Sequence, residues 1–331
     1  MLPTKPKYPS RISSLIGIFV IVVLALVIYL NRQWIIDEIN YLTFKPSATL
    51  QSFAKRSAMS QEGKFLFYSA RPSLEQADQF NKDCPSQSPT SAVLGCYDGR
   101  YIYIYNITNQ QLDGIRETTA AYEMLHAAYK RQSPADLQQL NSLIEETYNI
   151  PANKQMLSDS VDYFAKTEPG ERDDELFSLI ATEVKTVDPK LEKIYDKYFT
   201  NRQTLVGLYE KYQGVFESYK DQASSLQDQI QTMQDDINVK TANYDTDMNQ
   251  LNTDIATFNS KANSGGFSSQ AQFESERASL VSRVNALNDT RSAINAEIDE
   301  YNALVKKFND VQVTQQGLYK SINSVQGANS I

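Results

Sequence analysis

Residues 122–126, Y-E-M-L-H, are the part of this sequence whose residue types and spacing best suit chemistry. In a helix, positions 122 and 126 lie on one face, so two side chains there can bind the same metal ion. Glu123 could then act as general base on a metal-bound water. His126 is the one histidine of the chain, and a phenol with a pKa of about 10 is a poor zinc ligand at neutral pH. Tyr122 is therefore the weak member of this group.

The surrounding sequence T-A-A-Y-E-M-L-H-A-A-Y, residues 119–129, resembles the active-site helix of the zincin metallopeptidases, which carries H-E-x-x-H. Tyr122 stands where the first histidine of that motif would be. Further on, D-E-L-F-S, residues 174–178, resembles the N-E-x-x-S segment through which gluzincins supply a glutamate ligand. The resemblance implies zinc as cofactor, with His126, Glu175 and Tyr122 as metal ligands, Glu183 as an alternative to Glu175, and Glu123 as general base.

Tyr122 in place of a histidine argues against zinc binding. Without a ligand there the site offers only His126 and Glu175, whereas a catalytic zinc usually has three protein ligands. We therefore expect a degenerate site that binds no cofactor, with weak zinc binding as the alternative. The expected enzyme class is an inactive or weak metallopeptidase.

The same helix also has an ordinary interpretation as core. Tyr122, His126 and Tyr129 share one stripe with Ile115, and a lone histidine on such a face is often a hydrogen-bonded core residue. Glu123, however, has small residues as its helical neighbours, and a carboxylate in such a place needs a partner or a purpose.

Composition limits the function classes. The net charge is −8, and no basic stripe follows the first dozen residues, so we expect no nucleic-acid partner. Cys84 and Cys96 are the only cysteines. They flank a Pro- and Ser-rich loop, which favours a local disulfide in an oxidising compartment. Two free thiols in a cytoplasmic domain are the alternative.

Residues 12–30, I-S-S-L-I-G-I-F-V-I-V-V-L-A-L-V-I-Y-L, contain no charged residue. At about 1.5 Å per residue this run spans roughly 28 Å, enough for a hydrocarbon core. It is longer than the apolar part of a signal peptide, and no A-x-A-like cleavage site follows. Lys5, Lys7 and Arg11 precede it. The sequence therefore predicts a transmembrane signal-anchor helix in the bilayer, with residues 1–11 as a cytoplasmic tail and the bulk extracytoplasmic.

The next parts of the chain predict a stalk or linker over residues 31–47 and a small α+β, zincin-like domain over residues 48–200. Residues 63–70 have the length and apolar character of a strand, and residues 99–108 alternate aromatic and β-branched side chains as a strand does. Helices are expected from an N-cap at Asp113 to about Gln132, over 135–148 with Pro134 at its start, and over about 154–166 and 172–186.

Residues 201–325 predict a long antiparallel coiled-coil hairpin with its turn at 263–269, followed by a disordered tail at 326–331. Apolar residues recur at steps of three and four, which is a heptad seam. The seam includes Leu251, Ala242, Val284, Ile294 and Ile298.

Taken together, the parts resemble a group of uncharacterised single-pass bacterial membrane proteins. The parts that carry this resemblance are the anchor, the L-G-C-Y cysteine loop, the I-Y-I-Y-N strand, the T-A-A-x-E-M-L-H helix and the terminal coiled coil. The resemblance implies an architecture and a zincin ancestry, and no particular reaction.

Three functions fit the sequence. The first is a membrane-anchored, non-catalytic pseudoenzyme with a coiled-coil arm for a protein partner or self-association. The second is an exported zinc metallopeptidase with Glu123 as general base. The third is a purely structural envelope spacer.

Overall fold

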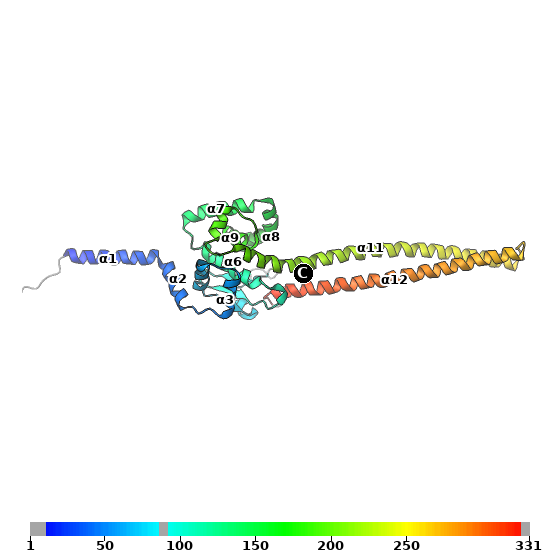
Figure 1. The fold of residues 1–331 in the computed structure, drawn as a ribbon, viewed down its shortest axis with the longest axis horizontal. Helices are drawn as coiled ribbons and strands as arrows, with labels where there is room; N and C mark the ends of the chain where they lie inside the picture. The colour runs from blue at the N-terminus through cyan, green and yellow to red at the C-terminus, as the bar shows by residue number, and fades with distance from the viewer. Residues whose placement is uncertain (1–10, 86–91, 326–331) are drawn as a thin grey trace, which may run out of the picture. The chain divides into compact units, whose positions relative to one another are not determined.

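The computed structural model describes residues 11–85 and 92–325 and is predominantly helical, with one small sheet (Figure 1). The chain divides into two compact units, Met1–Val215 with Tyr319–Ile331, and Phe216–Leu318. The expected disordered tail and all of the expected cytoplasmic tail except Arg11 lie outside the described residues.

The first unit contains most of the elements. Its helices are α1 (Arg11–Leu30), α2 (Arg32–Thr43), α3 (Ala48–Arg56), α4 (Gln61–Ser69), α5 (Ala77–Asp83), the 3₁₀ turn η1 (Gln110–Leu112), α6 (Ile115–Tyr129), α7 (Pro134–Tyr148), α8 (Pro151–Thr167), α9 (Arg172–Glu183) and α10 (Pro189–Tyr195). Its strands are β1 (Ser73–Glu75), β2 (Gly95–Tyr97) and β3 (Ile102–Tyr105). The helices expected between residues 113 and 186 are thus present as α6 to α9.

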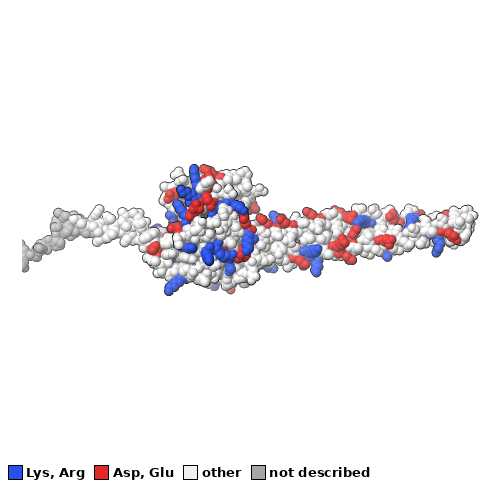
Figure 2. All heavy atoms as spheres, in the orientation of Figure 1, with Lys and Arg blue, Asp and Glu red and all other residues white. Residues whose placement is uncertain are grey.

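Helix α1 covers the charge-free run, and its large apolar side chains from Ile16 to Leu30 are exposed. On the visible side, Figure 2 shows this segment without charged side chains. Within the described part of the chain, no helix taken alone has the length and apolar character needed to cross a membrane. Ile18–Leu30 and Arg32–Thr43, bent by 65° at their junction, meet that requirement together by length and composition.

Residues 63–69 of the run expected as a strand belong to helix α4, and Ala70 is its C-cap, so that prediction was wrong. Ser60 caps the helix by accepting a hydrogen bond from the Gly63 N–H, 3.1 Å away. Leu66 and Phe67 are buried against the core. A short apolar run can be buried as helix or as strand, and here the serine cap and the adjacent core favour the helix.

The sheet has the order β1-β3-β2, with β1 parallel and β2 antiparallel to β3. The expected strand within residues 99–108 is confirmed as β3. Ile102 and Ile104 are fully buried, while the tyrosines between them are less so. This alternation follows from the two faces of a strand. Strand β2 lies at one edge, paired with β3 through Cys96 and Tyr103.

Helix α6 forms the centre of the core and is buried on nearly every side. Small residues such as Ala120 and Ala121 are fully buried, which lets neighbouring elements pack closely. Gly114 is the N-cap, with φ of 106°, a conformation that favours glycine. The predicted cap at Asp113 was therefore wrong. Its carboxylate instead pairs with Arg56 at 2.9 Å and with Lys211 at 2.7 Å.

Arg202, at the start of helix α11 (Arg202–Asn263), closes the carboxyl end of α9. Its side chain is 0% exposed and pairs with Glu192 at 2.7 Å. The guanidinium also donates to the carbonyl oxygens of Ala181, Val184 and Lys185 at 3.2, 2.6 and 3.0 Å. The last carbonyls of a helix have no partners within it. A cation there also interacts favourably with the negative end of the helix dipole. Arg202 therefore fixes the end of α9.

The second unit is a helical hairpin formed by the greater part of α11 and of α12 (Gln270–Ile322). Ion pairs join the two helices: Lys240 with Glu297, Lys261 with Glu276 at 2.7 Å, and Arg283 with Asp254 at 2.5 Å. Counted from Asn263 and from Gln270, the partner on α12 lies four residues further from the turn than the partner on α11 in every pair, so the helices run antiparallel in a constant register. Positive and negative side chains are interspersed along the visible side of the hairpin in Figure 2.

The seam between these helices differs from the sequence expectation at Ala242, Val284 and Ile298. Ala242 is exposed, and Val284 and Ile298 are 39% and 38% exposed. Lys240, Arg283 and Glu297, which neighbour these positions, are partly exposed and form the ion pairs between the two helices. A helix with a three-four repeat leaves some apolar residues beside the seam, and long charged side chains can cover the interface with their stems. Leu251 and Ile294 are buried in the seam as expected.

Candidate functional site

Helices α6 and α9 and strand β2 line a cavity of about 890 Å³ in the first unit. Tyr122, Glu123 and His126 reach it from α6, and Glu175 and Glu183 from α9. The structure therefore brings every candidate side chain to one cavity.

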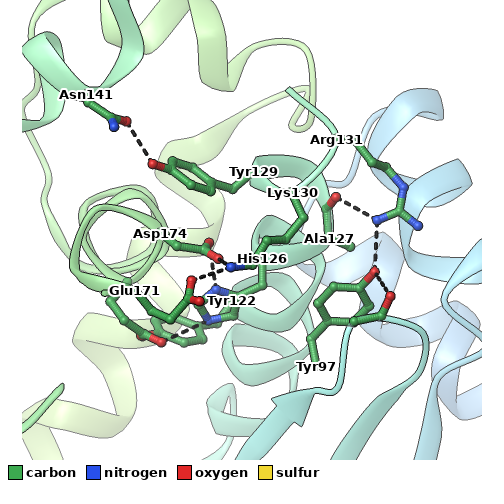
Figure 3. A network of polar contacts seen from close by, with 12 residues as sticks. Tyr97, Tyr122, His126, Ala127, Tyr129, Lys130, Arg131, Asn141, Glu171 and Asp174 are labelled. Atoms are coloured by element: carbon green, nitrogen blue, oxygen red, sulfur yellow. Dashed lines mark hydrogen bonds and ion pairs between the residues drawn. The ribbon is translucent and has the colours of Figure 1, made fainter. Parts of the chain in front are cut away.

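His126 points toward Asp174 of α9 (Figure 3), and its other ring nitrogen faces Glu175 of the same helix. Its Nδ1 is 2.8 Å from Asp174 Oδ1, and its Nε2 is 3.7 Å from Glu175 Oε1. Burial lowers the pKa of His126, but the hydrogen bond and charge of Asp174, together with the charge of Glu175, raise it to about 10. The imidazole is therefore protonated at neutral pH while it lies between these two carboxylates.

Tyr122 donates its phenolic hydrogen to Glu175 Oε2. Burial, reinforced by the negative charge of Glu175, raises the pKa of Tyr122 well above its usual value. Burial also raises the pKa of Glu175, to about 7, while His126 and the Tyr122 hydrogen bond act in the opposite direction. The phenol is thus a proton donor to the carboxylate beside it.

Glu123 is 4% exposed and faces the cavity next to the edge strand. A Cβ atom on Gly95 of β2 would lie 2.9 Å from Glu123 Oε1 and 2.6 Å from Thr119 Cγ2. Only glycine leaves room for this approach of strand and helix. Burial raises the pKa of Glu123 to about 8, and the positive charge of His126 partly offsets that effect.

Glu183 lines the same cavity but has a different partner. It accepts a hydrogen bond from Tyr209, which lowers its pKa, while the larger effect of burial raises the pKa to about 7. The negative charge of Glu183 helps to raise the pKa of Tyr122. Glu175, however, is the residue that contacts both Tyr122 and His126. Of the two alternatives in the sequence, Glu175 therefore lies with the candidate group.

Sequence reasoning missed Asp174 as a site residue, although it directly precedes Glu175. Asp174 is 3% exposed and also forms an ion pair with Lys130, whose Nζ is 3.1 Å away. Lys130 pairs with Glu171 as well (Figure 3). The spacing of His126 and Lys130 on α6, one helical turn apart, was a usable signal for a shared acidic partner.

A second polar group at the end of α6 was also missed (Figure 3). Arg131 binds the buried carboxylate of Asp37 in α2 through two bonds, of 2.7 and 2.6 Å. It also donates to Tyr97 Oη at 3.1 Å and to the Ala127 carbonyl at 2.7 Å. The segment 31–47, expected as a stalk, thus contacts the cavity-lining strand through one arginine.

The expected disulfide between Cys84 and Cys96 is present, so the alternative of two free thiols was wrong. Cys84 follows α5, and Cys96 is the middle residue of β2. Both line the cavity. The crosslink therefore fixes the edge strand beside Glu123.

The residues present do not fit the zinc ion that the resemblance implies. In the described ranges, no group of three or more His, Cys, Asp and Glu is placed to hold a metal. The donor chemistry agrees: Tyr122 keeps its proton, and its hydrogen bond occupies the Glu175 carboxylate that would be the ligand from α9. Comparisons with protein-family models, curated proteins and solved structures found no match to this chain.

Proposed function

We propose that this chain is a membrane-anchored, extracytoplasmic protein whose first unit carries a zincin-derived, non-catalytic binding cavity. The hairpin α11–α12 serves as an interaction arm, a coiled coil that contacts a protein partner or a second copy. In this proposal the domain is a pseudoenzyme, and zinc is not its cofactor.

One observation carries the proposal: the hydrogen bond from Tyr122 to Glu175. It occupies the carboxylate that would otherwise be the third ligand of a zincin site. Asp174 and Glu175 balance the positive charge of His126 in the same way. A group whose members already satisfy one another needs no metal to compensate its buried charges.

The anchor is supported by the charge-free run 12–30 and by the exposure of its apolar side chains. In water such a surface is unfavourable, whereas in a bilayer it is not. The disulfide supports an oxidising compartment for the first unit. Protease added to intact cells should therefore digest the hairpin, and full protection of the hairpin would refute the proposed orientation.

The site proposal is tested on the full chain purified in a mild nonionic detergent. Metal analysis after dialysis against micromolar zinc should find well below one zinc per chain, and a mixed peptide library should stay intact. Stoichiometric zinc together with cleavage that Glu123→Gln abolishes would overturn the proposal. Glu62→Gln, an exposed change of the same kind outside the cavity, is the matched control.

A metallopeptidase is the second candidate, and the position of Glu123 favours it. The carboxylate faces a cavity beside the edge strand β2, and its pKa of about 8 lies near the working pH of a general base. The same zinc and cleavage measurements distinguish this candidate from the first.

A further inference from the structure

The cavity next to α6 has an excess of acidic side chains over cationic ones. Among the described residues that line it, the positive charges are those of His126 and Lys130. Lys130 pairs with Glu171 and Asp174, and His126 lies between Asp174 and Glu175. Both cations of the wall therefore already have partners within the wall.

Glu123 is a buried acidic residue of the cavity that neither of these cations neutralises through an ion pair. It is 4% exposed, it lines the cavity, and within the described ranges its carboxylate takes part in neither a hydrogen bond nor an ion pair. Glu168, exposed at the same cavity, adds negative charge near Glu123. A buried acid without a partner costs free energy in the folded protein unless a ligand supplies the partner.

The other walls suit the apolar body of a ligand. Tyr163 and Phe164 of α8 line the cavity with their rings 5.3 Å apart, and Tyr212 lines it from α11. Aromatic faces attract organic cations and cover alkyl chains. A cavity of about 890 Å³ is larger than one ammonium group needs and accommodates several residues of a peptide.

We propose that this cavity binds a primary alkylammonium group, as on the lysine side chain of a peptide, with Glu123 as its direct partner. The ammonium hydrogen-bonds to the Glu123 carboxylate, while Tyr163 and Phe164 cover the alkyl stem. This inference deepens the proposed binding role of the cavity and names its ligand class. A single carboxylate suits the compact charge of lysine.

Calorimetric titration of the full chain in nonionic detergent tests the proposal with three probes at low salt. They are the peptide acetyl-Ala-Lys-Ala-amide, the same peptide with its lysine ε-acetylated, and the free diamine cadaverine. The lysine peptide should bind about tenfold or more tightly than its neutral counterpart, because the latter cannot give Glu123 a charged partner. Binding of cadaverine compared with that of the peptide identifies a free amine or a peptide as the source.

Variants then locate the contact. Glu123→Gln should weaken binding of the lysine peptide about tenfold or more and leave the acetylated peptide unaffected. Glu62→Gln removes the same charge from an exposed position outside the cavity and should leave both affinities unchanged. The comparison between the two peptides uses the unmutated protein, so it remains decisive if Glu123→Gln does not fold.

Equal affinity for the charged and neutral peptides, or no binding of any probe, would overturn the ammonium site. Neither result would affect the proposed lack of catalysis. Conversely, cleavage of a bound lysine peptide would uphold the ammonium site and refute the non-catalytic function. The two proposals can therefore fail separately.

Discussion

The phenolic hydroxyl of Tyr122 in α6 donates a hydrogen bond to the carboxylate of Glu175 in α9. These residues are far apart in sequence, and His126 lies one helical turn beyond Tyr122 with its Nε2 3.7 Å from the same carboxylate. A hydrogen bond from phenol to carboxylate thus lies where a metallopeptidase helix of this pattern would present a metal ligand.

Replacing Tyr122 by His should convert this arrangement into a zinc site. The new imidazole would face Glu175 and lie one turn from His126, which gives three ligands of the usual kinds. We expect the zinc affinity to rise about a hundredfold or more, measured by competition with a chelating dye. Glu175→Gln on top of it should lower the affinity again. The control is Tyr163→His, a cavity residue on α8; an equal gain there would show that position 122 is not special.

Stability should fall as the pH rises above about 5. The pKa values of Glu123, Glu175 and Glu183 are about 8, 7 and 7 in the folded protein, against 4.5 for an ordinary glutamate. The folded state therefore holds protons that the unfolded chain has lost, so their stabilising contribution is present at low pH and disappears as the pH passes 7 to 8. The pKa of His126, about 10 against 6.5, extends the decline to higher pH.

The unfolding midpoint measured from pH 5 to pH 9 checks this dependence. Glu183→Gln should make the curve flatter between pH 5 and 8, because the variant has no carboxyl group to ionise in the buried position. The difference from the unmutated protein should reach as much as a few kcal/mol at pH 8. Parallel curves for the two proteins would show that Glu183 ionises as freely in the folded state as in the unfolded chain.

Arg202→Met should destabilise the first unit by about 3 kcal/mol. The change removes the Arg202 hydrogen bonds to the carbonyls of Ala181 and Val184 at the end of α9, and it removes the partner of Glu192. Denaturant unfolding measures the loss. Lys185→Met is the matched control, because it breaks an exposed ion pair with Glu210 that contributes at most about 1 kcal/mol. Similar losses for the two variants would contradict the capping role of Arg202.

A charge in the hairpin seam should unfold the second unit alone. Leu251→Lys and Ile294→Lys each place an ammonium at a position that is less than a tenth exposed. Limited proteolysis should then cut the hairpin while the first unit stays intact. Ile298→Lys, at a side chain 38% exposed, should change little. Simultaneous loss of both units in a single transition would show that they do not unfold independently.

The crosslink between Cys84 and Cys96 should contribute about 2–3 kcal/mol to stability, since it closes a loop with a sequence separation of 12. Replacing both cysteines by serine should lower the free energy of unfolding by that amount. Free-thiol labelling of the unreduced protein should find neither cysteine reactive. Labelling of both would contradict the disulfide.

The strongly periodic elements could be predicted from the sequence. The prediction failed where a segment fits two structures and tertiary packing determines which one forms. Strand β3 was recognisable because Ile102 and Ile104 alternate with tyrosines. The run at residues 63–70 was misread because a short apolar stretch fits both a strand and a buried helix. Ala242, Val284 and Ile298 were misplaced because side chains next to a seam follow nearly the same repeat as those within it.

The candidate site was predicted in its members but not in its contacts. Tyr122, His126 and Glu175 were named from the sequence, and the structure brings them together. The role of Asp174 depends on how α9 is rotated against α6, which a single sequence does not specify. The pair between Asp37 and Arg131 is likewise a contact between distant segments, with no local periodicity to indicate it.

The bond between Arg131 and Asp37 has a mechanical consequence. It ties helix α2 to the end of α6 and, through Tyr97, to the edge strand of the cavity. Tilting α2 against the rest of the first unit would expose a buried ion pair that is held by two hydrogen bonds. The bend between α1 and α2 at Asn31 requires no such loss. With α1 in a bilayer, α2 and the cavity would rotate together about Asn31. The bend at Asn31 would then set the direction in which the cavity opens.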